Sequence, residues 1–321
     1  MNSERVARNL DVGVTASAPG KIILFGEHAV VFGEPALALA INFRTTVTVT
    51  PAKNWSVNGG SIDEPKQEYV KAAVNLSRTR SPFSINIESQ IPEGSGMGSS
   101  AAVTVATLGA LRPRDGDMNA EAIAREAFEV EHAVQGRASP IDTSTSAHGH
   151  AILVLRQKGA GFLWRIEKGD RSWLLHHRDT PPVTIVVGHT GIPGPTGPLV
   201  ANVKAFADRS KKARDMISEI GQITLAGVDA LGEGDLAKVG KLMNRNHELL
   251  NGLGVGHELL DKYVEAARPY AFGAKLTGAG GGGSMIALTE QPEKAAKAIE
   301  AAGGKAYKVM TGVAGLEAMQ G

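Results

Sequence analysis

The sequence predicts an α+β fold in two domains. Its 321 residues are enough for two domains of ordinary size, each with its own core. Strand-like and helix-like segments are interleaved without the regular alternation of a doubly wound sheet, which favours α+β over a Rossmann arrangement. After Pro181-Pro182 the pattern changes to one dominated by helices. We therefore predict domains at residues 1–180 and 181–321.

The first part of the chain is predicted to be rich in β-structure. Short apolar and β-branched segments separated by Gly and Pro fill residues 14–50, which is typical of several strands. Residues 68–78 (EYVKAAVNLSR) have helical spacing. Residues 82–89 (PFSINIES) place apolar side chains at alternate positions, as a half-buried strand does. A strand is thus expected just before the glycine-rich stretch at 92–102.

Two helices are predicted next. The small apolar segment 99–111 starts with serine and is followed by Arg112-Pro113, which indicates a buried helix. A second helix is expected over residues 120–135, and strands over 151–156 and 183–188.

The remainder of the chain is predicted to contain helices near 200–220, 235–250 and 256–268. A strand, a glycine turn, a strand, a helix and a final strand should follow. His148 and His150 are interpreted as strand residues, and the nine histidines do not predict a transition-metal site because no carboxylate pattern accompanies them.

The composition narrows the class of partner. Lysine and arginine (34) balance aspartate and glutamate (33), so no basic excess is available for nucleic acid or an anionic membrane. Cysteine is absent, which excludes disulfides, thiolate metal sites and cysteine nucleophiles, and fits a reducing cytoplasm. The N-terminus has no apolar core of a signal peptide, and no run reaches the roughly 18 apolar residues of a membrane span. We expect a soluble, cytoplasmic protein acting on small molecules.

The stretch PEGSGMGSSAA at residues 92–102 is a candidate phosphate loop. It lacks the lysine of a P-loop, and its glycines do not have Gly-x-Gly-x-x-Gly spacing. If Ser99 and Ser100 begin a helix, its free N–H groups and dipole bind an anion without a lysine, and a serine hydroxyl can reach a bound metal. The alternative is a plain connection between a strand and a helix.

The stretch APGKIILFGEH supplies a positive charge. Lys21 lies at the start of an apolar strand, and the polar pair Glu27-His28 separates two apolar segments. The alternatives are an ordinary surface cation for Lys21 and a hairpin turn for Glu27-His28.

Two acids are candidates for catalysis. Glu131 falls within the apolar arc of the predicted helix 120–135, where a carboxylate is costly unless a cation, a metal or hydrogen bonds meet it. Eleven residues later, Asp142 follows a proline among small hydroxyl residues. The simplest interpretation is that one of these two acids is a metal ligand and the other is a base. A buried salt bridge for Glu131 and a turn or capping role for Asp142 remain alternatives.

The stretch AKLTGAGGGGSMIAL predicts a glycine-rich hairpin. Five of the seven residues between Leu276 and Ser284 are glycine, whereas a tight hairpin needs only two loop residues. So much glycine indicates backbone packed against a ligand or against the other glycine loop. A flexible turn is the weaker alternative.

Together these stretches resemble the GHMP small-molecule kinases. SAPGKIILFGEHAVVFGEPA, PEGSGMGSSAA and KLTGAGGGGS are similar to the three signature motifs of that family, occur in its order and span Ala18 to Ser284. Within the family the first motif is most similar to that of the mevalonate kinases. Galactokinases share Gly-Glu-His but continue differently. The first 13 residues match nothing that we can place.

The resemblance implies a fold and a reaction. The fold would be the two-domain GHMP kinase fold, with an N-terminal domain like domain 2 of ribosomal protein S5 and a ferredoxin-like C-terminal domain. The expected reaction is ATP-dependent phosphorylation of the primary hydroxyl of mevalonate, giving 5-phosphomevalonate and ADP for isoprenoid synthesis. A sister kinase acting on a sugar or another small hydroxy acid is the alternative. The oligomeric state is not predicted, a homodimer being one option.

The resemblance also implies roles for individual residues. Ser100 and Glu131 would hold Mg²⁺, Asp142 would accept the proton of the acceptor hydroxyl, and Lys21 would neutralise charge near the transferred phosphoryl and keep Asp142 ionised. The ATP phosphates would be bound by Pro92, Glu93, Gly94, Ser95, Gly96, Met97, Gly98, Ser99, Ser100 and Ala101. The acceptor would be bound by Lys21, Glu27, His28, Asp142, Thr190, Gly278 and Ala279.

The third motif would support the phosphate loop and border the acceptor. Three departures from the usual pattern are mild: Ser284 stands where many relatives have cysteine, Met97 where leucine is common, and ASPID replaces the more usual glycine before the aspartate. None of them removes a functional group named above.

Overall fold

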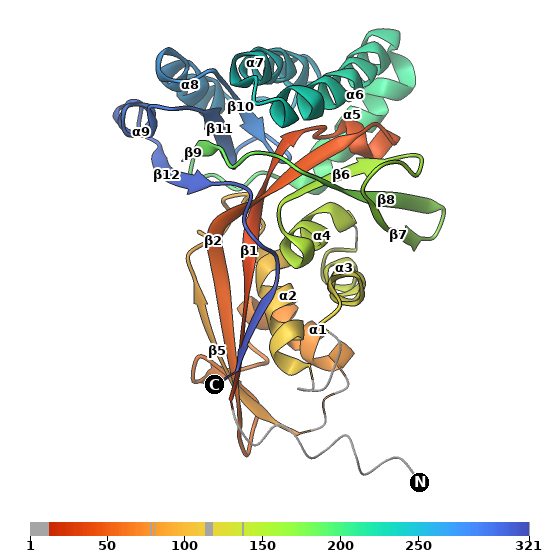
Figure 1. Cartoon of the computed structure of the whole chain (residues 1–321), viewed down its shortest axis with the longest axis vertical. Helices are drawn as coiled ribbons and strands as arrows, with labels where there is room; N and C mark the ends of the chain where they lie inside the picture. Colours follow the sequence, from red (N-terminus) through yellow and green to blue (C-terminus); the bar gives the residue numbers. More distant parts are fainter. Residues whose placement is uncertain (1–12, 78, 80, 113–117, 137, 321) are drawn as a thin grey trace.

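Two antiparallel sheets with helices packed on them form the molecule (Figure 1). Figure 1 shows a computed structural model, which describes residues 13–77, 79, 81–112, 118–136 and 138–320. The predicted α+β class is confirmed: the strands are antiparallel apart from one short parallel pairing between β3 and β5.

The first sheet is built on two long strands. β1 (Val14–Phe25) pairs with β2 (Ala36–Pro51), whose two ends pair with β5 (Phe83–Ser89) and β6 (Ala151–Leu155). The sheet is completed by β3 (Ser56–Val57), β4 (Gly60–Ser61), β7 (Phe162–Lys168), β8 (Arg171–Arg178) and the C-terminal β13 (Glu317–Gln320). Packed on it are α1 (Glu68–Ser77), α2 (Ser99–Leu111), α3 (Ala120–Gln135) and α4 (Pro140–His148) (Figure 1).

The second sheet has the order β10-β11-β9-β12. Its strands are β9 (Thr184–His189), β10 (Gly273–Thr277), β11 (Ser284–Leu288) and β12 (Lys305–Met310). Its helices are α5 (Thr196–Arg209), α6 (Lys211–Gly232), α7 (Leu236–Gly252), α8 (Glu258–Ala267) and α9 (Pro292–Ala301). Three short 3₁₀ turns are η1 (Ala29–Phe32), η2 (Pro65–Gln67) and η3 (Arg268–Tyr270).

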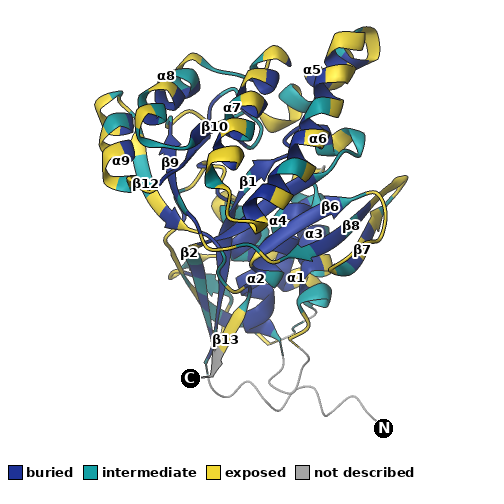
Figure 2. Ribbon diagram, turned by 45° about the horizontal axis from the view of Figure 1, so that its top comes forward, coloured by how far each residue is buried: buried dark blue, intermediate teal, exposed yellow. Residues whose placement is uncertain are grey.

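The two hydrophobic cores share β1, which Figure 2 shows as largely buried. One core lies between the first sheet and helices α1 to α4. The other lies under the second sheet and includes Ile22, Leu24 and Phe25 of β1. A strand of the first sheet thus ends inside the second core, so residues 20–28 lie where the two sheets meet. The chain passes from the first sheet to the second between β8 and β9, and β13 returns to the first sheet. The domain limits at residues 180 and 181 stay a prediction.

Helix α2 is nearly all small or apolar, and almost its whole length is buried. Small residues let it approach both the sheet and its neighbouring helices closely. The helix ends at Leu111, as predicted. Pro113 of the predicted stop signal lies outside the described residues. Arg78 and most of the first 13 residues lie outside them as well.

Several parts of the fold differ from the sequence prediction. Residues 162–178 form the hairpin of β7 and β8, which was not predicted. The strand assignment of His148 and His150 is wrong: His148 ends α4, and His150 has a φ of 53° in the turn that follows. Ser139 caps α4 and Pro140 occupies its first turn. These local signals start the helix although its Thr and Ser residues have only modest helix propensity.

None of the helices within the described residues is both long enough and apolar enough to cross a membrane.

Candidate active site

The phosphate loop (residues 92–102) leads directly into α2. Gly94, Gly96 and Gly98 have φ values of 69°, 72° and 78°, a conformation that glycine adopts without strain. The helix begins at Ser99, so its first N–H groups face the loop. A Cβ on Gly98 would lie 2.9 Å from Cγ of Lys21, so this glycine also makes room for the lysine side chain.

Lys21 joins β1 to the phosphate loop. Its backbone N–H donates to the carbonyl of Met97 at 2.9 Å, and its Nζ donates to the carbonyl of Gly96 at 3.2 Å. The same Nζ lies 3.0 Å from Oδ2 of Asp142, in the first turn of α4. Lys21 is nearly buried, whereas the Asp142 side chain is 29% exposed and therefore open to a substrate.

Glu131 lies beside this pair on α3. Oγ of Ser100 donates to its Oε1 at 2.9 Å, and the side chain is 3% exposed, as its position in the apolar arc predicted. Burial, reinforced by the negative charge of Asp142, raises the pKa of Glu131 to about 8; the Ser100 hydrogen bond and the charge of Lys21 act in the opposite direction. Lys21, Ser100, Glu131 and Asp142 are thus brought together in one place.

These oxygens fit a divalent cation. Glu131 makes no salt bridge within the described residues, so a buried carboxylate and a hydroxyl face each other without a neighbouring protein cation in contact. Carboxylate and hydroxyl oxygens are the ligands that Mg²⁺ prefers. The cost of burying Glu131 would fall if a cation bound there.

Tyr69 belongs to the same group and was not predicted. Its hydroxyl accepts a hydrogen bond from Nε2 of Gln135 at 2.9 Å. Burial raises its pKa, the charge of Glu131 adds to the increase, and hydrogen bonds with Gln135 and Ser100 oppose it. A tyrosine in an amphipathic helix gives no signal in a single sequence that would distinguish it from a packing residue.

His28 and Glu27 face different surroundings. Nε2 of His28 lies 2.8 Å from the carbonyl of Ala279, and its Nδ1 is buried without a partner among the described residues. Burial lowers the pKa of His28, which favours the neutral ring; Nε2–H then donates to Ala279 and Nδ1 is a free acceptor. Glu27 is instead fully buried in an ion pair with Nζ of Lys275, another residue that was not predicted. Its carboxylate does not face an open surface.

The glycine hairpin (β10, residues 278–283 and β11) borders the site. Gly278 and Ala279 follow β10, and Thr190 donates from Oγ1 to the carbonyl of Gly283 at 2.9 Å. Oγ of Ser284 donates to the carbonyl of Ser95 at 2.6 Å. The expectation that this hairpin packs against the other glycine loop is thus met by a direct contact.

The residues predicted to bind ATP differ in exposure. Glu93, Gly94 and Gly96 are exposed, and Pro92, Gly98, Ser99 and Ser100 are half-buried. The side chains of Ser95, Met97 and Ala101 are buried, so these three residues could contact a nucleotide only through their backbone.

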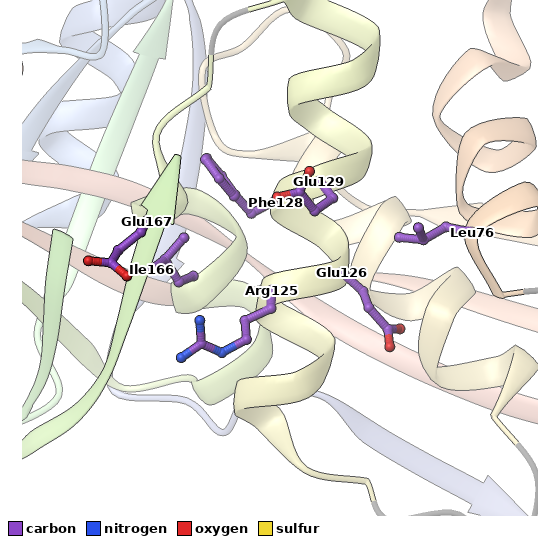
Figure 3. A pocket seen from close by; sticks show the side chains of 7 residues that line it. All are labelled: Leu76, Arg125, Glu126, Phe128, Glu129, Ile166 and Glu167. Atoms are coloured by element: carbon purple, nitrogen blue, oxygen red, sulfur yellow. The ribbon is translucent and has the colours of Figure 1, made fainter. Parts of the chain in front are cut away.

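A shallow pocket lies elsewhere, on the outer side of α3 (Figure 3). It is lined by Leu76, Arg125, Glu126, Phe128, Glu129, Ile166 and Glu167. Its charged groups are already paired, for example Glu129 with Lys168 at 2.5 Å and Arg125 with Glu121 at 2.5 Å. It contains none of the predicted site residues.

Three of the histidines, His148, His150 and His177, form a cluster at the end of α4. Nε2 of His148 lies 3.0 Å from Nδ1 of His177, and Nε2 of His177 lies 2.9 Å from Oδ1 of Asp179. In the part of the chain that the structure describes, no group of three or more His, Asp or Glu side chains is placed to hold a metal ion.

Known protein families match both halves of the chain. Residues 68–150 match the GHMP kinases N terminal domain, and residues 228–309 match the GHMP kinases C terminal domain. The first match contains the phosphate loop, Glu131 and Asp142, and the second contains the glycine hairpin.

Individual relatives are similar over nearly the whole chain. The mevalonate kinase of Thermococcus onnurineus is 39% identical, over 91% of this chain and 94% of the relative. Among solved structures, L. major mevalonate kinase in complex with R-mevalonate has a TM-score of 0.81 at 27% identity, covering 93% of this chain and 96% of its own. Methanococcus jannaschii mevalonate kinase has a TM-score of 0.77 at 26% identity, covering 92% of this chain and 98% of its own.

Proposed function

The chain belongs to the GHMP kinase family, and from this premise we propose that it transfers the γ-phosphoryl group of ATP to the primary hydroxyl of mevalonate. The products are 5-phosphomevalonate and ADP, which places the reaction in isoprenoid synthesis. The observation that carries the proposal is the contact of Lys21 with Asp142 at 3.0 Å, beside the N-terminus of α2. The 39% identity to a mevalonate kinase supports the choice of acceptor.

The phosphate loop and α2 bind the ATP phosphates. The first N–H groups of a helix have no partner within the helix and carry the positive end of its dipole, so they favour a polyphosphate. Positive φ values at Gly94, Gly96 and Gly98 turn the loop so that its backbone can approach the phosphates closely. Residues 92–101 thereby bind mainly through main-chain groups.

Asp142 is the general base. An alcohol is a poor nucleophile, and a carboxylate within about 3 Å of its proton can accept that proton as the phosphoryl group transfers. Lys21 lies 3.0 Å from this carboxylate and 3.2 Å from the Gly96 carbonyl, between the base and the phosphate loop. Its ammonium stabilises the charge that develops on the phosphoryl oxygens.

Ser100 and Glu131 would hold the divalent cation that the family implies, which we propose is Mg²⁺. When bound, Mg²⁺ neutralises charge on the phosphate oxygens. Glu131 must lose its proton to act as a ligand, and its buried position makes the ionised form dependent on the cation.

The acceptor binds on the side of His28 and the glycine hairpin. His28 is held on this side by its contact with the carbonyl of Ala279, and its buried Nδ1 has no partner among the described residues. Thr190, Gly278 and Ala279 border the same side. We propose that Glu27 acts by holding this region through Lys275 and does not contact the acceptor directly. ATP is supplied inside the cell, and we propose a cytoplasmic location.

A coupled ADP-release assay with purified protein tests the function. Mevalonate should be phosphorylated with Mg²⁺ and ATP, whereas galactose, homoserine and phosphomevalonate should be poor acceptors. Negligible turnover of mevalonate beside efficient turnover of another acceptor would favour the sister-kinase alternative.

Asp142→Asn tests the base. The amide cannot accept the proton, so kcat should fall by about 10²-fold or more while ATP still binds. Asp179→Asn, at an exposed acid of the histidine cluster, is the control and should retain wild-type kcat. A wild-type kcat in Asp142→Asn would refute the assignment.

A further inference from the structure

The three motifs hold one another through a closed ring of hydrogen bonds. The first motif meets the phosphate loop where the N–H of Lys21 donates to the carbonyl of Met97 at 2.9 Å. The phosphate loop meets the glycine hairpin where Oγ of Ser284 donates to the carbonyl of Ser95 at 2.6 Å. The hairpin then meets the first motif again, at Thr277 and Ile23.

The contact between Thr277 and Ile23 uses a single hydroxyl twice. Oγ1 of Thr277 donates to the carbonyl of Ile23 at 2.9 Å and accepts from the N–H of Ile23 at 3.3 Å. Because side chains alternate along a strand, Ile23 lies on the same face of β1 as Lys21, two residues earlier. Thr277 therefore fixes β1 next to the lysine that contacts Asp142.

Ser284 likewise contacts the phosphate loop through a hydroxyl that both donates and accepts. Ser284 is fully buried, and its hydrogen goes to the carbonyl of Ser95, while its oxygen can share the Nδ1–H of His189, at 3.2 Å, with the carbonyl of Gly283, at 3.0 Å. Both capacities of the hydroxyl are thus used, which fixes its orientation.

Thr277 and Ser284 are direct cross-strand partners at the mouth of the hairpin. Residues opposite each other in an antiparallel pair point to the same face, with Cβ atoms about 5 Å apart. Each hydroxyl thus holds one motif, and the pairing of β10 with β11 fixes the spacing between the two. Thr277 is 2% exposed, so neither side chain is available to contact a substrate.

We propose that Thr277 and Ser284 are positioning residues that act on different sides of the site. Thr277 sets the acceptor side of the site through Ile23 and Lys21, and Ser284 sets the phosphate side through Ser95. The inference rests on the proposed function, because the two sides are those of a phosphoryl transfer from ATP to a hydroxyl.

The test uses matched variants. Thr277→Val removes the hydroxyl with little change of shape, and Thr277→Ser keeps it. Ser284→Ala removes the other hydroxyl. Thr224→Val is the control, because Thr224 is equally buried and its Oγ1 donates to the carbonyl of Ile220 within α6.

Kinetic and binding constants should distinguish the role of Thr277 from that of Ser284. An unpaired buried backbone group typically costs enough to change a constant about tenfold. Thr277→Val should therefore raise KM for mevalonate about tenfold and lower kcat, while the Kd for AMP-PNP with Mg²⁺ stays within about twofold. Ser284→Ala should raise that Kd about tenfold and leave KM for mevalonate within about twofold. Thr277→Ser should restore the wild-type constants, and Thr224→Val should change stability alone.

Hydrogen exchange measured by mass spectrometry tests the inference without an acceptor. Thr277→Val should speed exchange in residues 21–28 and not in 92–98, and Ser284→Ala should do the reverse. Equal loosening of both segments by either variant, or no difference between Thr277→Val and Thr277→Ser, would overturn the inference. Absence of mevalonate turnover in the wild type, with the exchange pattern as expected, would instead overturn only the proposed function.

Discussion

At the scale of single residues, the site depends on buried charged side chains and on glycines that are packed closely against them. Glu131 is buried on α3 beside Asp142, and its pKa of about 8 favours the protonated acid at neutral pH. Gly98 has a positive φ and lies against the side chain of Lys21. Each of these features gives a prediction that a single substitution can test.

Glu131 should make the stability of the metal-free protein depend on pH. Its folded pKa is raised above the ordinary value of 4.5, so its favourable contribution is complete below about pH 4.5 and is lost as pH rises toward about 8. Glu131→Gln removes this dependence. At pH 8 the variant should be more stable than the wild type by on the order of 1–3 kcal/mol, and near pH 4.5 the two should be similar.

Urea unfolding of both proteins between pH 4.5 and 8 measures this difference. Glu129→Gln is the control, since Glu129 lies on the same helix but is exposed and paired with Lys168. Parallel pH profiles for the wild type and Glu131→Gln would contradict the buried, protonated state.

Gly98→Ala should damage catalysis more than Gly94→Ala. Both glycines have a positive φ, so alanine at either position costs about 1 kcal/mol in backbone conformation. Only at Gly98 would the new Cβ meet Lys21, at 2.9 Å from Cγ and 3.1 Å from Cε, whereas Gly94 has nothing within 4 Å. We expect Gly98→Ala to lower kcat by a further factor of about ten as Lys21 moves off Asp142. Equal kcat values in the two variants would argue against this contact.

At the scale of elements, prediction succeeded where local pattern decides the structure. The helix over 120–135 was found with its true limits, because Asn119 caps it and its apolar arc is regular. Helix α4 was missed because four of its residues are Thr or Ser, and only packing between α2, α3 and β1 buries them. Asp142 was a candidate because it follows a proline among small hydroxyl residues, whereas its placement on a helix was not predicted.

The contact between the first motif and β10 also could not be predicted from the sequence pattern. Glu27 and Lys275 are far apart in the chain and form a fully buried ion pair. Burial raises the pKa of Glu27 and lowers that of Lys275, and each charge opposes the shift of its partner. A lysine inside a strand usually faces water, so no local signal indicated that this one is buried.

Removing one member of this pair should be worse than removing both. Lys275→Met leaves the Glu27 carboxylate buried without its cation, which typically costs about 3–5 kcal/mol. The double variant Glu27→Gln with Lys275→Met leaves no buried charge and should recover at least half of that loss. Denaturant unfolding of Lys275→Met, Glu27→Gln and the double variant gives the coupling energy. Additive losses would mean that the two side chains do not depend on each other.

At the scale of the whole molecule, the C-terminal segment ties the two sheets together. It leaves β12 of the second sheet and pairs as β13 with β1 of the first. On the way, the N–H of Leu316 donates to the carbonyl of Ala147 at the end of α4, and its side chain lies against Gly109 of α2. The two helices whose N-termini form the site are thus joined at their other ends. Such a return strand is set by long-range pairing, which residue pattern does not reveal.

Arg44 anchors this segment, and its loss should loosen one end of the molecule selectively. The guanidinium donates to the carbonyls of Ser17, Ala314 and Gly315 at 2.7 to 3.0 Å. Arg44→Met leaves these acceptors unpaired and should cost about 2–3 kcal/mol, or roughly 3–5 °C in Tm. Hydrogen exchange should increase in residues 14–17 and 311–320 while β9 to β11 stay protected. Glu317→Ala, which removes only the exposed partner of Arg44, should cost less than about 1 kcal/mol. If Arg44→Met melts like the wild type, pairing of β13 alone holds the segment.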